Sequence, residues 1–388
     1  MISDLWLPYG VVQEPRLGDG PRLATSEGRV AMTEPIRQWL AEQVPTPNRG
    51  DWVAGFRLAC AFILPVAVGE WADQPIIGLF VGIGAFMVAN ADLGESYGQR
   101  LRLMVPATIA IAGMTAAGMA VGTNAVAAVV VGVAVLLLSG LTAAFGREAT
   151  IFGTFVAFAY VIGVGITEAS PISIVTVVVS LLAGGTFAML LSAVHIVGFG
   201  HVPDEEPEPW PTLLSRARSR LDGTLMRHAC ALAIAGGIGL AVVPFTHQSN
   251  GAWLVTGALI VLKPGYRDTL RTALLRAGGT VAGAALAGAI AATISNVWAL
   301  LAVALGLTWV AEATIRYSFA IFVVLITPLS ILLTNVFAPG DWQVALLRTA
   351  DVAAGSAIAI VVATALRERG DQGRATSGVE TGQSNGPA

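Results

Sequence analysis

Four long stretches of this chain contain no charged residue, and they constrain the fold more than any other feature. They cover residues 103–146, 169–203, 229–262 and 277–311. One transmembrane helix needs about 20 apolar residues, so each stretch has roughly the length of two crossings. Only 12% of the 388 residues are charged, which is about half the share of a soluble globular protein. The pattern excludes a soluble enzyme and a single-span receptor and predicts an all-α polytopic membrane protein.

Polar, proline and glycine residues divide the apolar sequence into about twelve segments, which we expect to be transmembrane helices. The first six are residues 53–68, 75–91, 103–121, 125–145, 149–166 and 172–197; the second six are 225–243, 251–263, 277–294, 297–311, 317–336 and 343–366. The chain then consists of an N-terminal tail (1–50), a six-helix membrane domain (51–200), an acidic, proline-rich and then basic linker (201–224), a second six-helix membrane domain (225–366) and a disordered tail (367–388).

The distribution of cations predicts the orientation. With twelve crossings, both termini and the linker lie on one side of the membrane, and that side receives 21 of the 22 lysines and arginines. Cytoplasmic loops carry an excess of such residues. We therefore expect a multi-pass protein of the cytoplasmic membrane with both termini in the cytoplasm.

The two halves of the sequence resemble each other. An even number of crossings per copy makes both copies enter from the same side, so we expect two parallel six-helix repeats with a pseudo-twofold axis along the membrane normal. Chance similarity within Ala- and Gly-rich sequence is the alternative. The matches are Arg57 with Arg227, Cys60 with Cys230, Gly84 with Gly257, and Arg102 with Arg276.

The sequence contains no motif for enzymatic chemistry. A phosphate-binding loop requires Gly-x4-Gly-Lys-Ser/Thr, whereas the only lysine, Lys263, is followed by Pro264. The four histidines are scattered without metal-ligand spacing, and the loops opposite the linker are too short for a catalytic site. We expect no enzyme, no nucleotide motor, no cofactor or metal, and no nucleic-acid partner.

Charged residues within the apolar segments are the candidate functional residues, because each costs about 2.5 to 3.5 kcal/mol at the bilayer centre unless it finds a partner or water. Arg57 and Arg227 lie about one turn into their segments, where they either extend to the interface or line an anion path. The same two alternatives hold for Arg102 and Arg276. Glu312 and Arg316, four residues apart, are placed to neutralise each other.

Arg348 and Asp351 lie three residues apart in the last segment, which allows either a structural ion pair or a site for substrate or proton coupling. Segments 75–91 and 251–263 are short and occupy matching places in the two halves, which is typical of a transport site. Trp253 and Thr256 then line that site, or Trp253 is an interfacial aromatic residue.

The second half resembles the fusaric acid resistance-like, or aromatic acid exporter, family. The resemblance rests on Gly251-Ala-Trp253 followed by Thr256 and Pro264, on the run from Arg276 through Gly279-Thr280 to Gly283, and on Arg348 through Asp351 to Gly355. It implies export of aromatic carboxylic acids or related organic anions. It also implies kinship with plant malate-type anion channels, in which paired six-helix bundles enclose a path lined by basic residues.

Trp253, Arg276, Thr280, Arg348 and Asp351 match positions of that family. Two departures are visible: many relatives have a large soluble domain that this chain replaces with a short linker, and Lys263 stands where an uncharged polar residue is usual.

We therefore expect a motor-free exporter of organic anions in the lipid bilayer, and a homo-oligomer is compatible with the sequence. A passive anion channel and a non-transporting scaffold for envelope assembly are the alternatives. The expected path residues are Arg57, Arg102, Arg227, Trp253, Thr256, Lys263, Arg276, Thr280, Arg348 and Asp351.

Overall fold

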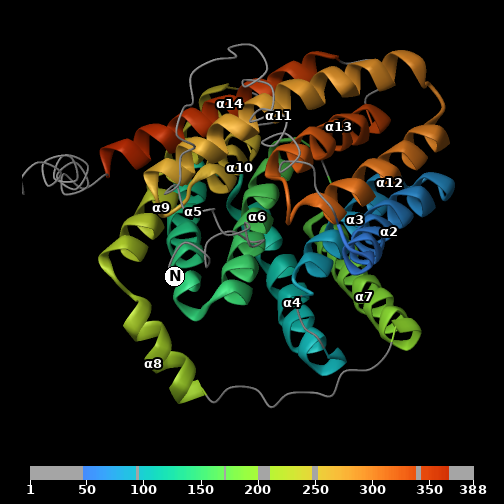
Figure 1. Cartoon of the computed structure of the whole chain (residues 1–388). Coiled ribbons are helices and arrows are strands. Elements are labelled where there is room, and N and C mark those ends of the chain that lie inside the picture. Colours follow the sequence, from blue (N-terminus) through green and yellow to red (C-terminus); the bar gives the residue numbers. More distant parts are fainter. Residues whose placement is uncertain are drawn as a thin grey trace, which may run out of the picture.

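A computed structural model describes residues 47–92, 96–169, 172–199, 210–246, 252–337 and 342–366. Within these ranges the regular structure is helical (Figure 1). The helices of the first half are α2 (Arg49–Trp71), α3 (Pro75–Asn90), α4 (Tyr97–Val121), α5 (Ala125–Leu141), the short 3-10 turn η2 (Thr142–Phe145), α6 (Arg147–Ala169) and α7 (Ile174–Phe199). After α8 (Trp210–Arg220), the second half contains α9 (Gly223–Thr246), α10 (Ala252–Val261), α11 (Tyr266–Thr293), α12 (Val297–Thr314), α13 (Phe319–Phe337) and α14 (Trp342–Ala365).

The prediction of a polytopic helical membrane protein is confirmed. Eight helices in the described part of the chain are long and apolar enough to cross a bilayer: α2, α4, α5 with η2, α6, α7, α9, α11 and α12. The segments predicted to be short are short, because α3 has 16 residues and α10 has 10. The full count of about twelve crossings stays a prediction.

Side-chain caps begin several helices. Asn48 and Asp51 form a capping box at the start of α2, and Ser96 with Gln99 forms another at the start of α4. Each box satisfies backbone N–H groups that have no partner within the helix. Between η2 and α6, Gly146 adopts φ 110°, a conformation that glycine reaches without a steric penalty.

Helices α3 and α7 pack closely because glycine faces backbone at their crossing. A Cβ added to Gly84 would lie 2.7 Å from the carbonyl oxygen of Leu181, and one added to Gly184 would lie 2.1 Å from that of Val81. Small residues allow such close approach between membrane helices.

The crossing of α10 with α14 is built in the same way. A Cβ on Gly257 would lie 2.8 Å from the carbonyl oxygen of Val352, and a Cβ on Gly355 would lie 2.0 Å from that of Leu254. In both halves, therefore, the second and the last apolar helix are joined by a reciprocal pair of glycines.

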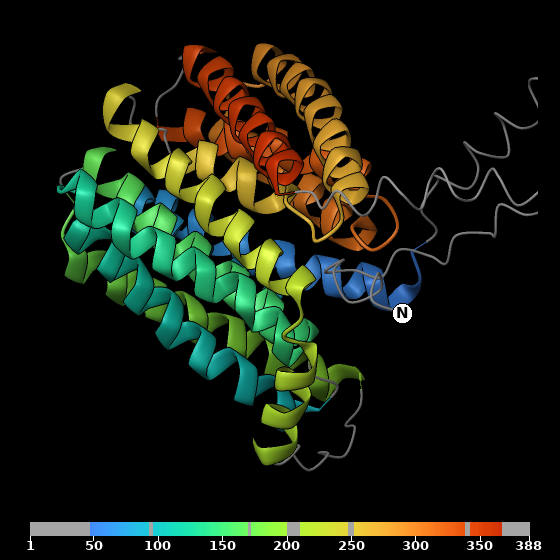
Figure 2. The ribbon, with the colours of Figure 1, turned by 90° about the vertical axis from the view of Figure 1, so that its left-hand side faces the viewer.

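The two halves meet chiefly along two helix pairs, with a smaller contact between α6 and α10. Helix α12 packs along α2, and α9 packs along α5, so that the fourth helix of each half lies beside the first helix of the other (Figure 1). The Trp309 indole donates a hydrogen bond to the carbonyl of Trp52 at 2.8 Å across the first pair. Figure 2 shows the two groups of helices, blue to green and yellow to red, joined along these elements.

The basic part of the linker forms α8, which carries Arg216, Arg218 and Arg220 and projects from the bundle in Figure 1. Ala217 of α8 packs against Ala143 and Ala144 of η2. Three predicted segments lie outside the described residues: most of the N-terminal tail, the acidic part of the linker and the C-terminal tail. Of the N-terminal tail, the structure describes residues 47–50, which include the start of α2.

Candidate functional site

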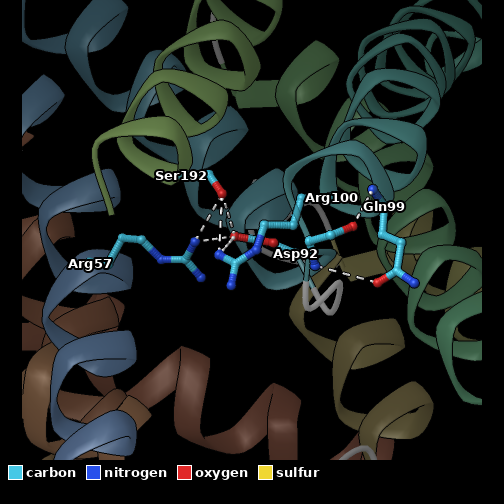
Figure 3. A network of polar contacts seen from close by, with 6 residues as sticks. Arg57, Asp92, Gln99, Arg100 and Ser192 are labelled. Carbon is cyan, nitrogen blue, oxygen red and sulfur yellow. Dashed lines mark hydrogen bonds and ion pairs between the residues drawn. The ribbon is translucent and has the colours of Figure 1, made fainter. Parts of the chain in front are cut away.

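The first half brings three charged side chains from separate parts of the chain into one buried cluster (Figure 3). Arg57 of α2 and Arg100 of α4 both pair with Asp92, which follows α3. The distance from Arg100 Nη1 to Asp92 Oδ2 is 3.2 Å. Ser192 of α7 donates its hydroxyl to the same carboxylate oxygen at 2.9 Å. We call these four residues the Asp92 cluster.

The Asp92 cluster contains two cations and one anion. The Asp92 side chain is fully buried, and those of Arg57 and Arg100 are 12% and 14% exposed. Asp92 Oδ1 and the Nε atoms of both arginines are buried and have no hydrogen-bond partner among the described residues. The carboxylate thus neutralises one of the two positive charges, and the cluster retains a net charge of about +1.

The second half contains two partly buried cations, Lys263 and Arg276. Lys263 lies two residues beyond the end of α10, and its backbone N–H donates to the hydroxyl of Thr269 at 3.0 Å. The buried imidazole of His228 on α9 forms a hydrogen bond with the backbone of Lys263. Arg276 of α11 lies near enough for its charge to repel that of Lys263. We call these four residues the Lys263 group.

The Lys263 group differs from the Asp92 cluster in its anions. Among the residues that the structure describes, no carboxylate lies within the 4.0 Å salt-bridge distance of Lys263 or Arg276. Asp268 attracts Lys263 electrostatically from an exposed position. The Nε atom of Arg276 is buried without a hydrogen-bond partner in the described part of the chain.

The remaining expected path residues are spread over the bundle. Arg102 is exposed, and Arg227 donates to the hydroxyl of Thr224 at 3.2 Å. Trp253 and Thr256 are partly buried on α10, whereas Thr280 is 6% exposed on α11.

The last expected pair is only partly described. The side chain of Arg348 lies outside the described residues, and Asp351 keeps a buried Oδ2 atom without a partner among those described. The path hypothesis stays a prediction for all ten residues, including Lys263 and Arg276.

The expected neutralisation of Glu312 by Arg316 is wrong. Helix α12 ends at Thr314, so the two residues do not share a helical face. Arg316 instead lies 3.6 Å from Asp51 Oδ1, and Tyr317 donates its hydroxyl to Asp51 Oδ2 at 2.6 Å. The hydrogen bond to this carboxylate raises the pKa of the Tyr317 phenol.

Sequence reasoning missed Asp92, Arg100, Ser192 and His228 as site residues. Asp92 follows a short apolar segment directly, and this position was the available signal. Among the described residues, no group of three or more histidine, cysteine or acidic side chains is able to hold a metal ion.

Comparison with known proteins finds a family model and a relative that are similar to parts of this chain. A family model described as fusaric acid resistance protein-like matches residues 232–362. An uncharacterized protein of Synechocystis sp. is 29% identical over 165 residues, which are 42% of this chain and 21% of that protein. The match thus spans about a fifth of the length of this relative. No solved structure matches the chain. The family resemblance seen in the motifs is confirmed for this region.

Proposed function

We propose, for a chain whose second half is fusaric acid resistance protein-like, that it exports organic anions, and aromatic carboxylic acids among them, across the cytoplasmic membrane without a nucleotide motor. The observation that carries this proposal is the excess of positive charge on partly buried side chains. Arg57, Arg100, Lys263 and Arg276 lie among apolar helices with Asp92 as the one carboxylate paired to any of them among the described residues. Such cations are costly unless they are compensated, and a negatively charged substrate compensates them.

The proposed architecture is two parallel six-helix repeats that form about twelve crossings. Two features support it. The reciprocal glycine contacts occur between the second and last helices of both halves, and the fourth helix of each half packs on the first helix of the other. In this proposal both pairs of contacts are related by a twofold axis along the membrane normal, and the anion path follows that axis between the halves.

The proposed orientation places both termini and the linker in the cytoplasm. The cell interior is electrically negative, so moving one negative charge outward gains about 2.3 kcal/mol per 100 mV. Export of an anion therefore needs no coupling ion.

Flux through reconstituted protein tests the function. Liposomes loaded with radiolabelled 4-hydroxybenzoate at pH 8 are given a potassium diffusion potential with valinomycin, and efflux is compared with protein-free liposomes. We expect efflux that increases with the potential and saturates with substrate concentration. Potential-driven flux that does not saturate supports the passive channel instead. Efflux equal to that of empty liposomes, from correctly folded protein, rules out transport of this substrate class and favours the scaffold.

A further inference from the structure

The reciprocal glycine contacts allow the two halves to be compared position by position. Gly84 and Gly257 occupy the same place at the α3–α7 and α10–α14 crossings, as do Gly184 and Gly355. The glycine crossings therefore align α3 with α10 residue by residue. The same alignment applies to the residues that follow the two helices.

The charge at the end of these two helices is not the same. Asp92 lies two residues beyond the end of α3, and Lys263 lies two residues beyond the end of α10. Counted from the glycine crossing instead of the helix end, the position that matches Asp92 is Gly265. In either register the carboxylate of the first half has no acidic counterpart in the second.

The missing carboxylate has an electrostatic consequence. In the Asp92 cluster, the buried anion touches both arginines and the hydroxyl of Ser192. In the Lys263 group, neither Lys263 nor Arg276 forms an ion pair with a carboxylate of the described residues, and the Nε atom of Arg276 is buried without a partner among those residues. Such a site is stabilised by an anion that comes from outside the chain.

We propose that the Lys263 group binds the carboxylate of an external ligand, and that Asp92 is the chain's own carboxylate in the corresponding site of the first half. Each chain then binds one carboxylate, between Lys263 after α10 and Arg276 on α11. This inference rests on the proposed function, since it assigns the binding site of the same transporter to one half of the molecule.

Ligand-dependent thermal unfolding of the purified full-length protein in detergent tests the site. Benzoate is the probe, and neutral benzamide is its matched control. A ligand that binds only the folded state raises the Tm with its concentration. We expect a saturable Tm increase with benzoate and none with benzamide. Lys263→Gln and Arg276→Gln should each weaken the apparent affinity for benzoate at least tenfold.

The control variant is Arg271→Gln, which removes an exposed arginine from the same helix and should leave the benzoate response unchanged. Lys263→Asp places a carboxylate two residues beyond the end of α10, as Asp92 lies two residues beyond the end of α3, and it should abolish the response while the protein stays folded. Equal losses in Arg271→Gln and Arg276→Gln would overturn the assignment, and so would a response to inorganic phosphate that exceeds the response to benzoate.

The first half offers a second test that does not depend on the folding of the Lys263 variants. Asp92→Gly removes the carboxylate and leaves space for a small carboxylate ion. Formate should therefore raise the Tm of this variant toward the wild-type value, and the increase should saturate with formate concentration. Asp92→Asn fills the same space with a neutral group and should not respond to formate. If neither variant responds, the first half is not a carboxylate site and the comparison between the halves fails.

The flux measurement separates this inference from the proposed function. Potential-driven efflux from wild-type liposomes that persists unchanged in Lys263→Asp contradicts the site and leaves transport standing. Absence of efflux in the wild type, with a benzoate response that Arg276→Gln removes, contradicts transport and leaves the binding site standing.

Discussion

A buried carboxylate between two arginines is important chiefly because its loss would leave two uncompensated cations. Asp92→Asn keeps the size of the side chain and removes its charge, so Arg57 and Arg100 lose their counter-ion within the protein interior. Removing one partner of a buried ion pair costs about 3–5 kcal/mol. We expect a free energy of unfolding lower by about that amount, measured by denaturant unfolding in detergent.

The control for Asp92→Asn is Glu148→Gln, which neutralises an exposed carboxylate at the start of α6. This substitution should change the unfolding free energy by less than about 0.5 kcal/mol, as surface substitutions usually do. A similar stability of the two variants would show that Asp92 does not compensate the arginines.

Tyr317→Phe tests the hydrogen bond that joins the α12–α13 connection to the cap of α2. Its hydroxyl donates to Asp51 Oδ2 at 2.6 Å, and such a bond contributes about 1 kcal/mol. The pKa of Tyr317 is raised in the folded protein, so this contribution is complete below the ordinary tyrosine pKa of about 10 and disappears as the pH rises through the folded-state value. The wild-type and variant unfolding curves should therefore differ at pH 7 and approach each other above pH 10; a constant difference at all pH values would contradict the assignment.

At the residue scale, the sequence identified the cations more readily than their partners. Arg57, Lys263 and Arg276 were candidates because charge in apolar sequence is conspicuous. Asp92 and Ser192 were not, because their role depends on contacts over 35 and 135 residues from Arg57. No local pattern specifies such contacts. The pairing expected for Glu312 and Arg316 failed for a local reason, since the end of α12 at Thr314 breaks their helical spacing.

At the scale of elements, the glycine crossings determine how closely α10 and α14 approach. In Gly355→Ala, the new Cβ would lie 2.0 Å from the Leu254 carbonyl oxygen, so the helices must separate. Overpacking of this kind costs about 1–3 kcal/mol. We expect a lower Tm in detergent for Gly355→Ala and for its counterpart in the first half, Gly184→Ala.

Gly278→Ala on α11 is the matched control for the crossing. A Cβ at Gly278 meets nothing within 4 Å, and alanine is favoured over glycine in a helix interior by about 0.8–1.0 kcal/mol. This variant should be at least as stable as the wild type. If Gly355→Ala is as stable as Gly278→Ala, the helices α10 and α14 do not approach each other as closely as the Gly355 contact requires.

The positions of the helices were largely predictable, whereas their packing was not. Hydropathy and punctuation by glycine, proline and polar residues located each apolar helix, because a bilayer requires such a pattern. The packing of α12 on α2 and of α9 on α5 depends on side-chain fit between segments far apart in sequence. The basic half of the linker, Trp210–Arg220, was expected only as a patch, yet its spacing of leucine, alanine and arginine forms a helix.

At the scale of the whole molecule, the proposed parallel arrangement of the halves predicts which side of the membrane the starts of α5 and α12 face. Asn124 and Asn296 cap α5 and α12, because the side-chain oxygen of each accepts a hydrogen bond from a backbone N–H, that of Ala127 or Ala299 respectively. If each half enters the membrane from the cytoplasm, both caps lie on the outer face. Their neighbours Thr123 and Ser295 are exposed and are replaced by cysteine without loss of either cap.

The labelling experiment uses a background in which Cys60 and Cys230 are alanine, because both are free thiols. A membrane-impermeant maleimide added to intact cells should modify Thr123→Cys and Ser295→Cys to the same extent. Asp222→Cys, in the exposed connection between α8 and α9, should react only after the membrane is permeabilised, since the linker is predicted to be cytoplasmic. Two parallel copies require both cap positions to share one face. If one cap position is modified from outside and the other only from inside, the two halves are inverted relative to each other. The Asp92 cluster and the Lys263 group would then face opposite compartments, and the two would not be equivalent sites.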